Sequence, residues 1–210
     1  MSEGYSIKSQ DYSRTTKLTE KCVITSSGMV ADIDALHKDM ITKVKIYERL
    51  HKKQPDTESM AQLLSHTLYG RRFMPYYAFN LLCGLSRAGE GVVYGYDAIG
   101  SYDTVSYGCQ GSGQYMGAPL LDNQFVGHNH LVRKLAQSLP ESVDAAKDII
   151  NSIAERDIYT GGQVEIVVVS KACNSYKRDK KPQIRQTILA IIGCICLLFV
   201  GARPAHFGLR

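Results

Sequence analysis

The spacing of apolar residues along this chain changes at Gly70, and this change limits the folds that the chain can adopt. Before Gly70, apolar residues recur at helical spacing, which predicts one amphipathic helix over 30–51 and a second over 58–69. After it, "YYAFNLLCGL", "GVVYGYDAIG" and "YDTVSYGCQG" are short β-rich runs separated by turn residues, as in an antiparallel meander. A short strand is also predicted at "CVITS". These elements indicate an α+β fold with helices packed on an antiparallel sheet.

The second half of the chain predicts more helix and one more strand. The small-residue stretch "GSGQYMGAPLLDNQF" opens a helical segment, and Ser142 is a candidate N-cap for a helix that runs to about Arg156. An apolar strand is expected from Val164 to Ser170. Between them, "AERDIYTGG" places an Arg-Asp pair, a threonine and two glycines at the helix end. Taken alone, this junction is explained as a helix terminus with a glycine turn.

Composition favours one domain in a reducing compartment. A chain of 210 residues can bury one large core. The six cysteines lack the paired spacing of a zinc site, and no signal peptide is recognisable, so free thiols in the cytosol or nucleus are expected. His128 and His130 have no third candidate ligand nearby and are interpreted as loop residues. We therefore expect no cofactor and no metal.

The C-terminal part departs from this pattern. A basic cluster has no interleaved aromatic residues, which argues against nucleic-acid binding; it consists of Lys177, Arg178, Lys180, Lys181 and Arg185. The uncharged run "QTILAIIGCICLLFVGA" follows, at the low end of the ~17–25 residues that a membrane span requires. Insertion of Ile188 to Ala202 into a bilayer is one interpretation. A buried hydrophobic segment and a misread exon are the others.

Four separate stretches, in order, resemble one known family. They are "RRFMPYYAFNLLCGL", "YGYDAIGSYDTVSYGCQGSG", "PLLDNQ" and "AERDIYTGGQVEIVVVSK". Together they resemble β-type subunits of the 20S proteasome, most of all the non-catalytic members at the sixth ring position. The resemblance runs from Ser2 to Lys171, so we expect a partial β-type domain over 1–171, a basic linker over 172–185 and an atypical hydrophobic tail over 186–210.

The resemblance implies a fold and a set of partners. The fold is a four-layer αββα sandwich of the N-terminal nucleophile hydrolase type, here lacking its first strands. The implied partners are other β subunits in a heteroheptameric ring, the stacked α ring and the opposing β ring, in cytoplasm and nucleus. The implied role is structural: completing the chamber in which proteins are degraded. No cofactor and no nucleic acid are implied.

The resemblance also assigns roles to four residues. In active members an N-terminal threonine is both nucleophile and base, assisted by an aspartate and a lysine and braced by two turns. Ser112, Asp157 and Thr160 match the bracing positions, and Arg14 occupies the probable lysine position. Arginine stays protonated and cannot share a proton as a perturbed lysine can. No Gly-Thr processing junction occurs in the sequence, and Ser2 would lie in the wrong part of the fold. We therefore predict no catalytic residue and structural roles for the three bracing positions.

Three alternatives stay open at this point. The first is an active threonine peptidase whose nucleophile-bearing N-terminus is missing from the sequence, which predicts an upstream Gly-Thr junction and lysine in place of Arg14. The second is a tail-anchored derivative of a decayed subunit. The third is a partial or mis-assembled reading of the gene for a normal subunit.

Overall fold

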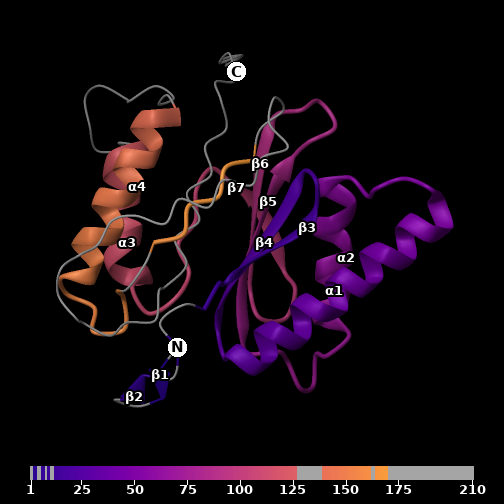
Figure 1. The fold of residues 1–210 in the computed structure, drawn as a ribbon, viewed down its shortest axis with the longest axis horizontal. Helices are drawn as coiled ribbons and strands as arrows, with labels where there is room; N and C mark the ends of the chain where they lie inside the picture. Colours follow the sequence, from indigo (N-terminus) through magenta and orange to yellow (C-terminus); the bar gives the residue numbers. More distant parts are fainter. Residues whose placement is uncertain are drawn as a thin grey trace, which may run out of the picture.

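The computed structural model describes residues 2–3, 6–7, 9, 12–126, 139–161 and 164–169. Figure 1 shows helices on both sides of one main sheet. The strands are β1 (Ser2–Glu3), β2 (Ser6–Ile7), β3 (Thr15–Thr19), β4 (Cys22–Gly28), β5 (Ala78–Leu85), β6 (Gly91–Tyr96) and β7 (Tyr102–Val105). The helices are α1 (Val30–His51), α2 (Thr57–Tyr69), α3 (Gln114–Leu121) with a π-helical turn over Asp122–Val126, and α4 (Leu139–Ala154).

The main sheet is an antiparallel meander of five strands in the order β3-β4-β5-β6-β7. Helices α1 and α2 form the connection between β4 and β5. The registers are unambiguous: Thr25 pairs with Leu81, and Tyr94 with Thr104. The predicted α+β class and the meander are confirmed. Strand β3 was not predicted, although its sequence "TTKLT" is rich in β-branched threonine.

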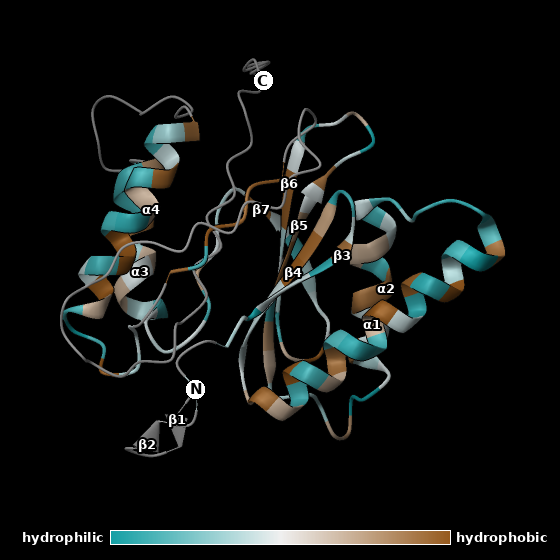
Figure 2. Cartoon of the chain, viewed as in Figure 1, coloured by the Kyte–Doolittle hydropathy of each residue, from teal (hydrophilic) through white to brown (hydrophobic). Residues whose placement is uncertain are grey.

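Helices α1 and α2 cover one face of the sheet and enclose the main core (Figures 1 and 2). The apolar stripe of α1 is buried from Ile33 to Val44, as the helical spacing predicts, but Leu50 at the end of the helix is exposed. The apolar stripe of α2 is buried at Met60, Leu64 and Leu68. These side chains pack against Ile24 of β4 and Leu82 of β5. The fully buried members of the two helices are Ile33, Leu36, Met40, Met60, Leu64 and Leu68.

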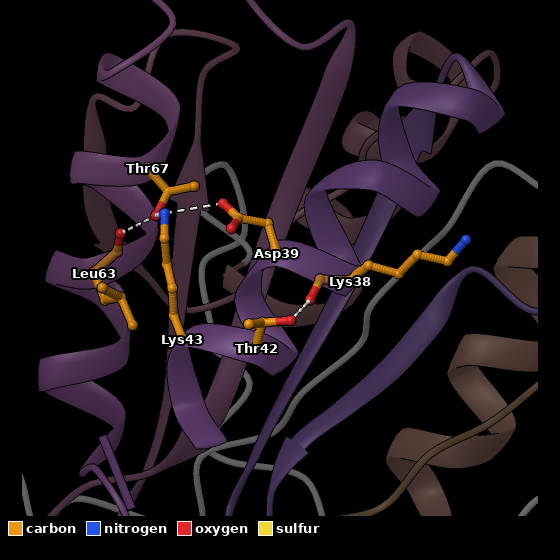
Figure 3. A network of polar contacts seen from close by, with 6 residues as sticks. All are labelled: Lys38, Asp39, Thr42, Lys43, Leu63 and Thr67. Atoms are coloured by element: carbon orange, nitrogen blue, oxygen red, sulfur yellow. Dashed lines mark hydrogen bonds and ion pairs between the residues drawn. The ribbon is translucent and has the colours of Figure 1, made fainter. Parts of the chain in front are cut away.

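A polar bridge ties α1 to α2 at the rim of this core (Figure 3). The Lys43 ammonium lies 2.9 Å from Asp39 Oδ2 and donates a hydrogen bond of 2.8 Å to Thr67 Oγ1. Thr67 in turn donates to the Leu63 carbonyl within α2. Because Lys43 is only partly buried, this bridge orients the two helices more than it stabilises them.

Helix α4 starts earlier than expected. The predicted N-cap, Ser142, is wrong: the helix begins at Leu139, and Ser142 is buried inside its first turn. Pro140 explains the difference, because a proline fits the first turn of a helix, where its missing N–H would have no partner. The predicted apolar face of α4 is confirmed at Ala146, Ile149, Ile150 and Ile153.

Helices α3 and α4 lie on the side of the sheet away from α1 and α2 (Figure 1). Leu121 of α3 packs with Ile149 and Ile153 of α4 and with Cys109 from the segment after β7. A separate apolar cluster lies on this face of the sheet, formed by Leu81, Cys83 and Val93. Both faces of the sheet are therefore buried.

The predicted strand over 164–170 is not formed in the part that the structure describes. Residues 164–169 carry no ladder hydrogen bonds, although Figure 1 shows them as an extended segment between the helices and the sheet. An apolar, β-branched run sets strand propensity but does not supply a partner strand. The segment is tied to the rest of the chain by Ser13 Oγ, which donates to Glu165 Oε2 at 2.7 Å.

No helix in the described ranges is both long and apolar enough to cross a bilayer. The linker expected over 172–185 and the tail over 186–210, including Ile188 to Ala202, lie outside the described residues.

Candidate functional site

The candidate site is built from the end of α4 and the loop that follows β7. At the end of α4, the Asp157 amide still bonds the Ile153 carbonyl, and the chain then turns so that the Thr160 amide bonds the Asp157 carbonyl. The Asp157 side chain supports the same turn, because Oδ1 accepts a hydrogen bond of 3.1 Å from the Tyr159 amide. This is the local bonding by which aspartate favours turns. The stretch "RDIYT" therefore folds back on its own aspartate.

The second Asp157 oxygen joins this turn to the loop after β7. Oδ2 accepts hydrogen bonds from Ser112 Oγ at 2.7 Å and from Thr160 Oγ1 at 2.5 Å. Asp157 is only 8% exposed and Thr160 is 2% exposed. A buried carboxylate is tolerated when hydrogen bonds replace its hydration, and three donors do so here. The structure thus brings together the three predicted bracing residues, although Ser112 and Asp157 are 45 positions apart in the sequence.

Gly113 allows this close approach. A Cβ atom at Gly113 would lie 2.5 Å from Ile153 Cγ2, and 3.5 Å from both Asp157 Oδ2 and Thr160 Oγ1. A contact of 2.5 Å requires the neighbouring atoms to move. The glycine after Ser112 is therefore needed because the loop lies directly against α4 and its terminal turn.

The cluster is chemically closed. A serine or threonine nucleophile needs a base within hydrogen-bonding distance that can take its proton near neutral pH. Both hydroxyls here donate to the same carboxylate instead. Among the described residues, no histidine, lysine or amino group bonds to either hydroxyl. The arrangement fastens the loop after β7 to the turn at the end of α4.

Arg14 lies in the segment just before β3. Its side chain is buried, and its guanidinium carbon is 5.7 Å from the centre of the Tyr12 ring. Its carbonyl accepts a hydrogen bond from the Ser26 amide. Within the described part of the chain, Arg14 shares no hydrogen bond or ion pair with Ser112, Asp157 or Thr160.

Sequence reasoning missed a second buried polar group, centred on His37 of α1. Thr16 Oγ1 and Ser26 Oγ each lie 2.8 Å from a ring nitrogen of His37, and Ser26 Oγ donates to Asn80 Oδ1 at 2.5 Å. Burial lowers the pKa of His37 to about 4, although the nearby Asp34 charge opposes that change. The ring is therefore neutral at physiological pH. The sequence feature that could have revealed it is the position of His37 on the apolar face of the predicted helix, one residue after Leu36.

The described residues hold no group of three potential metal ligands. His128 and His130 lie outside the described ranges. The thiols of Cys22, Cys83 and Cys109 are buried and form no disulfide among the described residues. Burial raises the pKa of the Cys22 thiol to about 12 and that of Cys109 to about 11, so both stay protonated and are weak nucleophiles.

Comparisons with known proteins give a consistent result. The model of the family "Proteasome subunit" matches residues 1–169. A protein of Arabidopsis thaliana named "Proteasome subunit beta type-1" is 48% identical over 174 residues, which cover 80% of this chain and 78% of the relative. Proteins of the same name from Oryza sativa subsp. japonica and Dictyostelium discoideum are each 45% identical, and cover 82% and 80% of this chain and 80% and 72% of their own lengths.

Proposed function

Because the chain belongs to the proteasome subunit family, we propose that it is a non-catalytic β-type subunit of the 20S proteasome core. Its role is structural: it helps to assemble the chamber in which other subunits cut proteins during ATP- and ubiquitin-dependent degradation. The relatives named "Proteasome subunit beta type-1" match this chain over about four-fifths of its length, which supports the sixth position in the β ring.

The Asp157 cluster supports a structural role for its own side chains. The Asp157 carboxylate accepts hydrogen bonds from Ser112, Thr160 and the Tyr159 amide. It therefore acts as a fastener between the loop after β7 and the end of α4. The observation that carries the non-catalytic role is Arg14, which stands at the position that the resemblance assigns to the catalytic lysine. A guanidinium stays protonated near neutral pH and cannot take up a proton from a nucleophile.

The partners follow from family membership. The subunit assembles with other proteasome subunits. In finer detail, we propose that it takes one place in a heteroheptameric β ring, contacts the stacked α ring and the opposing β ring, and works in the cytoplasm and nucleus. The buried, protonated thiols of Cys22 and Cys109 are compatible with the reducing interior of these compartments.

Purification of native particles tests this function. The chain should copurify with the proteasome core in an amount equal to that of other β subunits. An irreversible electrophile directed at N-terminal threonines should label other subunits of the purified particle and leave this one unmodified. Labelling of this subunit would favour an active threonine peptidase, and its absence from the particle would remove the structural role.

A further inference from the structure

The Arg14 side chain is charged and buried, and no group of opposite charge in the described part of the chain is paired with it. The residue is only 6% exposed. Among the residues that the structure describes, no carboxylate lies within ion-pair distance of its guanidinium, and no oxygen accepts a hydrogen bond from it. Exposed cations do have such partners: Arg87 Nε lies 2.7 Å from Asp56 Oδ2. Because a guanidinium stays protonated at any physiological pH, Arg14 cannot lose its charge to avoid this burial.

The aromatic contact beside Arg14 compensates only part of this burial. The guanidinium carbon lies 5.7 Å from the centre of the Tyr12 ring, which is near the outer limit of a cation–π interaction. The Tyr12 hydroxyl donates a hydrogen bond of 2.6 Å to Asp34 Oδ1, so this carboxylate is bonded to the tyrosine and not to the arginine. A buried charge without a counter-charge is strongly unfavourable, which indicates that an anion completes the site.

The Arg14 guanidinium is recessed but keeps some contact with solvent. The fully enclosed side-chain atoms without a partner include Thr25 Oγ1 and Ser27 Oγ, but no nitrogen of Arg14 belongs to this set. The small exposed fraction of Arg14 therefore includes its N–H groups. A carboxylate that reached them would accept two parallel N–H···O hydrogen bonds, the geometry in which a guanidinium and a carboxylate fit best.

The surroundings of Arg14 favour a ligand with a single negative charge. The Ser26 amide donates to the Arg14 carbonyl, and Thr16 follows two residues later, so strand alternation places these three side chains on one face of the sheet. Thr16 and Ser26 are bonded to the neutral ring of His37, which adds no positive charge. The Asp34 carboxylate adds a negative charge nearby. One cation with one carboxylate in its vicinity suits a monovalent anion better than a divalent phosphate.

We propose that Arg14 anchors a binding site for a small carboxylate anion. Free acetate and the C-terminal carboxylate of a short peptide carry the same group, and the guanidinium would hold either one through the same pair of hydrogen bonds. The inference does not depend on the proposed function, because every group that forms the site belongs to one chain. It also assigns a role to the arginine that stands at the probable lysine position, where it cannot activate a nucleophile.

Thermal unfolding of the purified full chain tests the site. Sodium acetate replaces sodium chloride at pH 7 and constant ionic strength, and it should raise the melting temperature saturably, by about 3–6 °C at ten times the dissociation constant. Sodium phosphate at the same ionic strength should have a much smaller effect.

Variants of two arginines locate the effect. Arg14→Met should abolish the response to acetate. Arg14→Lys keeps the charge but loses the planar fork, so its affinity for acetate should fall by about tenfold. Arg49→Met removes an exposed arginine of α1 and is the matched control, which should respond like wild type. An unchanged response in Arg14→Met, or an equal loss in Arg49→Met, would overturn the inference.

The stability of Arg14→Met without added carboxylate is an independent measurement. Its melting temperature should equal or exceed that of wild type, because the substitution removes a buried charge that has no partner. A clear loss of stability would show that a carboxylate of the chain itself neutralises Arg14, with Asp11, three residues earlier in the sequence, as the first candidate. That result would overturn the inference.

A short peptide and its C-terminal amide identify the source of the ligand. Stabilisation by acetate alone would assign the site to a free small carboxylate, and stabilisation by the peptide acid as well would assign it to a peptide terminus; both outcomes support the inference. Equal stabilisation by the peptide acid and its amide, or by acetate and phosphate, would show that the carboxylate is not what Arg14 recognises and would overturn it.

Discussion

At the scale of single residues, the Asp157 carboxylate holds two loops together through one atom. Replacing it in Asp157→Ala leaves the Ser112 and Thr160 hydroxyls and the Tyr159 amide without their acceptor. We expect the free energy of unfolding to fall by about 2–3 kcal/mol, since buried donors lose a charged partner. Asp157→Asn, which keeps one acceptor oxygen, should lose less. Chemical denaturation of the isolated chain measures both.

The same substitution separates a structural from a catalytic role. Particles that do incorporate Asp157→Ala should keep wild-type peptidase activity per particle. A loss of peptidase activity in fully assembled particles would contradict the role proposed for this cluster.

Gly113 gives a steric test at the same site. In Gly113→Ala the new methyl group would meet Ile153 Cγ2 at 2.5 Å, so α4 or the loop must shift. We expect a loss of about 1–3 kcal/mol, the usual effect of overpacking. Gly95→Ala is the matched control, because its added Cβ would meet nothing nearer than 3.7 Å. Equal melting temperatures for the two variants would show that the loop does not lie against α4.

His37 predicts a pH dependence of stability. Its pKa is about 4 in the folded chain and about 6.5 when unfolded, so between these values the unfolded state binds the extra proton. The contribution is complete above pH 6.5 and is lost as the pH falls to 4, by about 3 kcal/mol in all. His37→Gln has no titrating ring, yet its amide can still bond Thr16 and Ser26. Subtracting the unfolding curves of the two proteins across pH 4–7 should isolate this loss, and parallel curves would refute it.

At the scale of elements, packing between α1 and the sheet outweighs the polar bridge to α2. Met40 is fully buried in the main core, and Met40→Ala should cost about 2–5 kcal/mol. Lys43→Ala removes the contacts to Asp39 and Thr67 but should cost less than about 1 kcal/mol, because its ammonium is partly exposed. Thermal denaturation of the two variants compares them directly. A larger loss for Lys43→Ala would show that the bridge, and not the core, fixes α1.

The elements also differ in how well the sequence predicts them. Helix α1 runs over Val30–His51 as its apolar spacing predicts, because a long amphipathic stripe has one clear solution. Strand β3 was not predicted because four of its five residues are threonine or lysine, which give no clear apolar alternation, and its pairing with β4 orders it. The opposite error occurred at residues 164–169, where a strand was predicted but not formed. This segment has strong strand propensity but no ladder partner among the described residues. Local pattern therefore predicts helices better than strand pairing.

At the scale of the whole molecule, the candidate site shows what a single sequence can and cannot reveal. Ser112 and Asp157 are distant in sequence, and only the resemblance to a family placed them together; the structure confirms their contact at 2.7 Å. No periodic signal predicts that contact, because it depends on how the loop after β7 packs on α4. The His37 group was missed for the same reason: its four members come from β3, β4, α1 and β5, which meet only in the folded chain.

Temperature distinguishes folding defects from assembly defects in the whole subunit. Assembly stabilises only the folded state, so a variant that folds poorly enters particles in proportion to its folded fraction. Asp157→Ala lowers that fraction, so growth at lower temperature should raise its incorporation toward that of wild type.

The measurement is the ratio of assembled to free chain at two growth temperatures, with Gly95→Ala as the reference for a harmless substitution. Protease resistance of the free chain provides the independent readout of folding, and it should be low for Asp157→Ala at the higher temperature. If cooling restores protease resistance but not incorporation, Asp157 also acts at an interface, and the assignment of Asp157 as a purely internal fastener at the end of α4 is wrong.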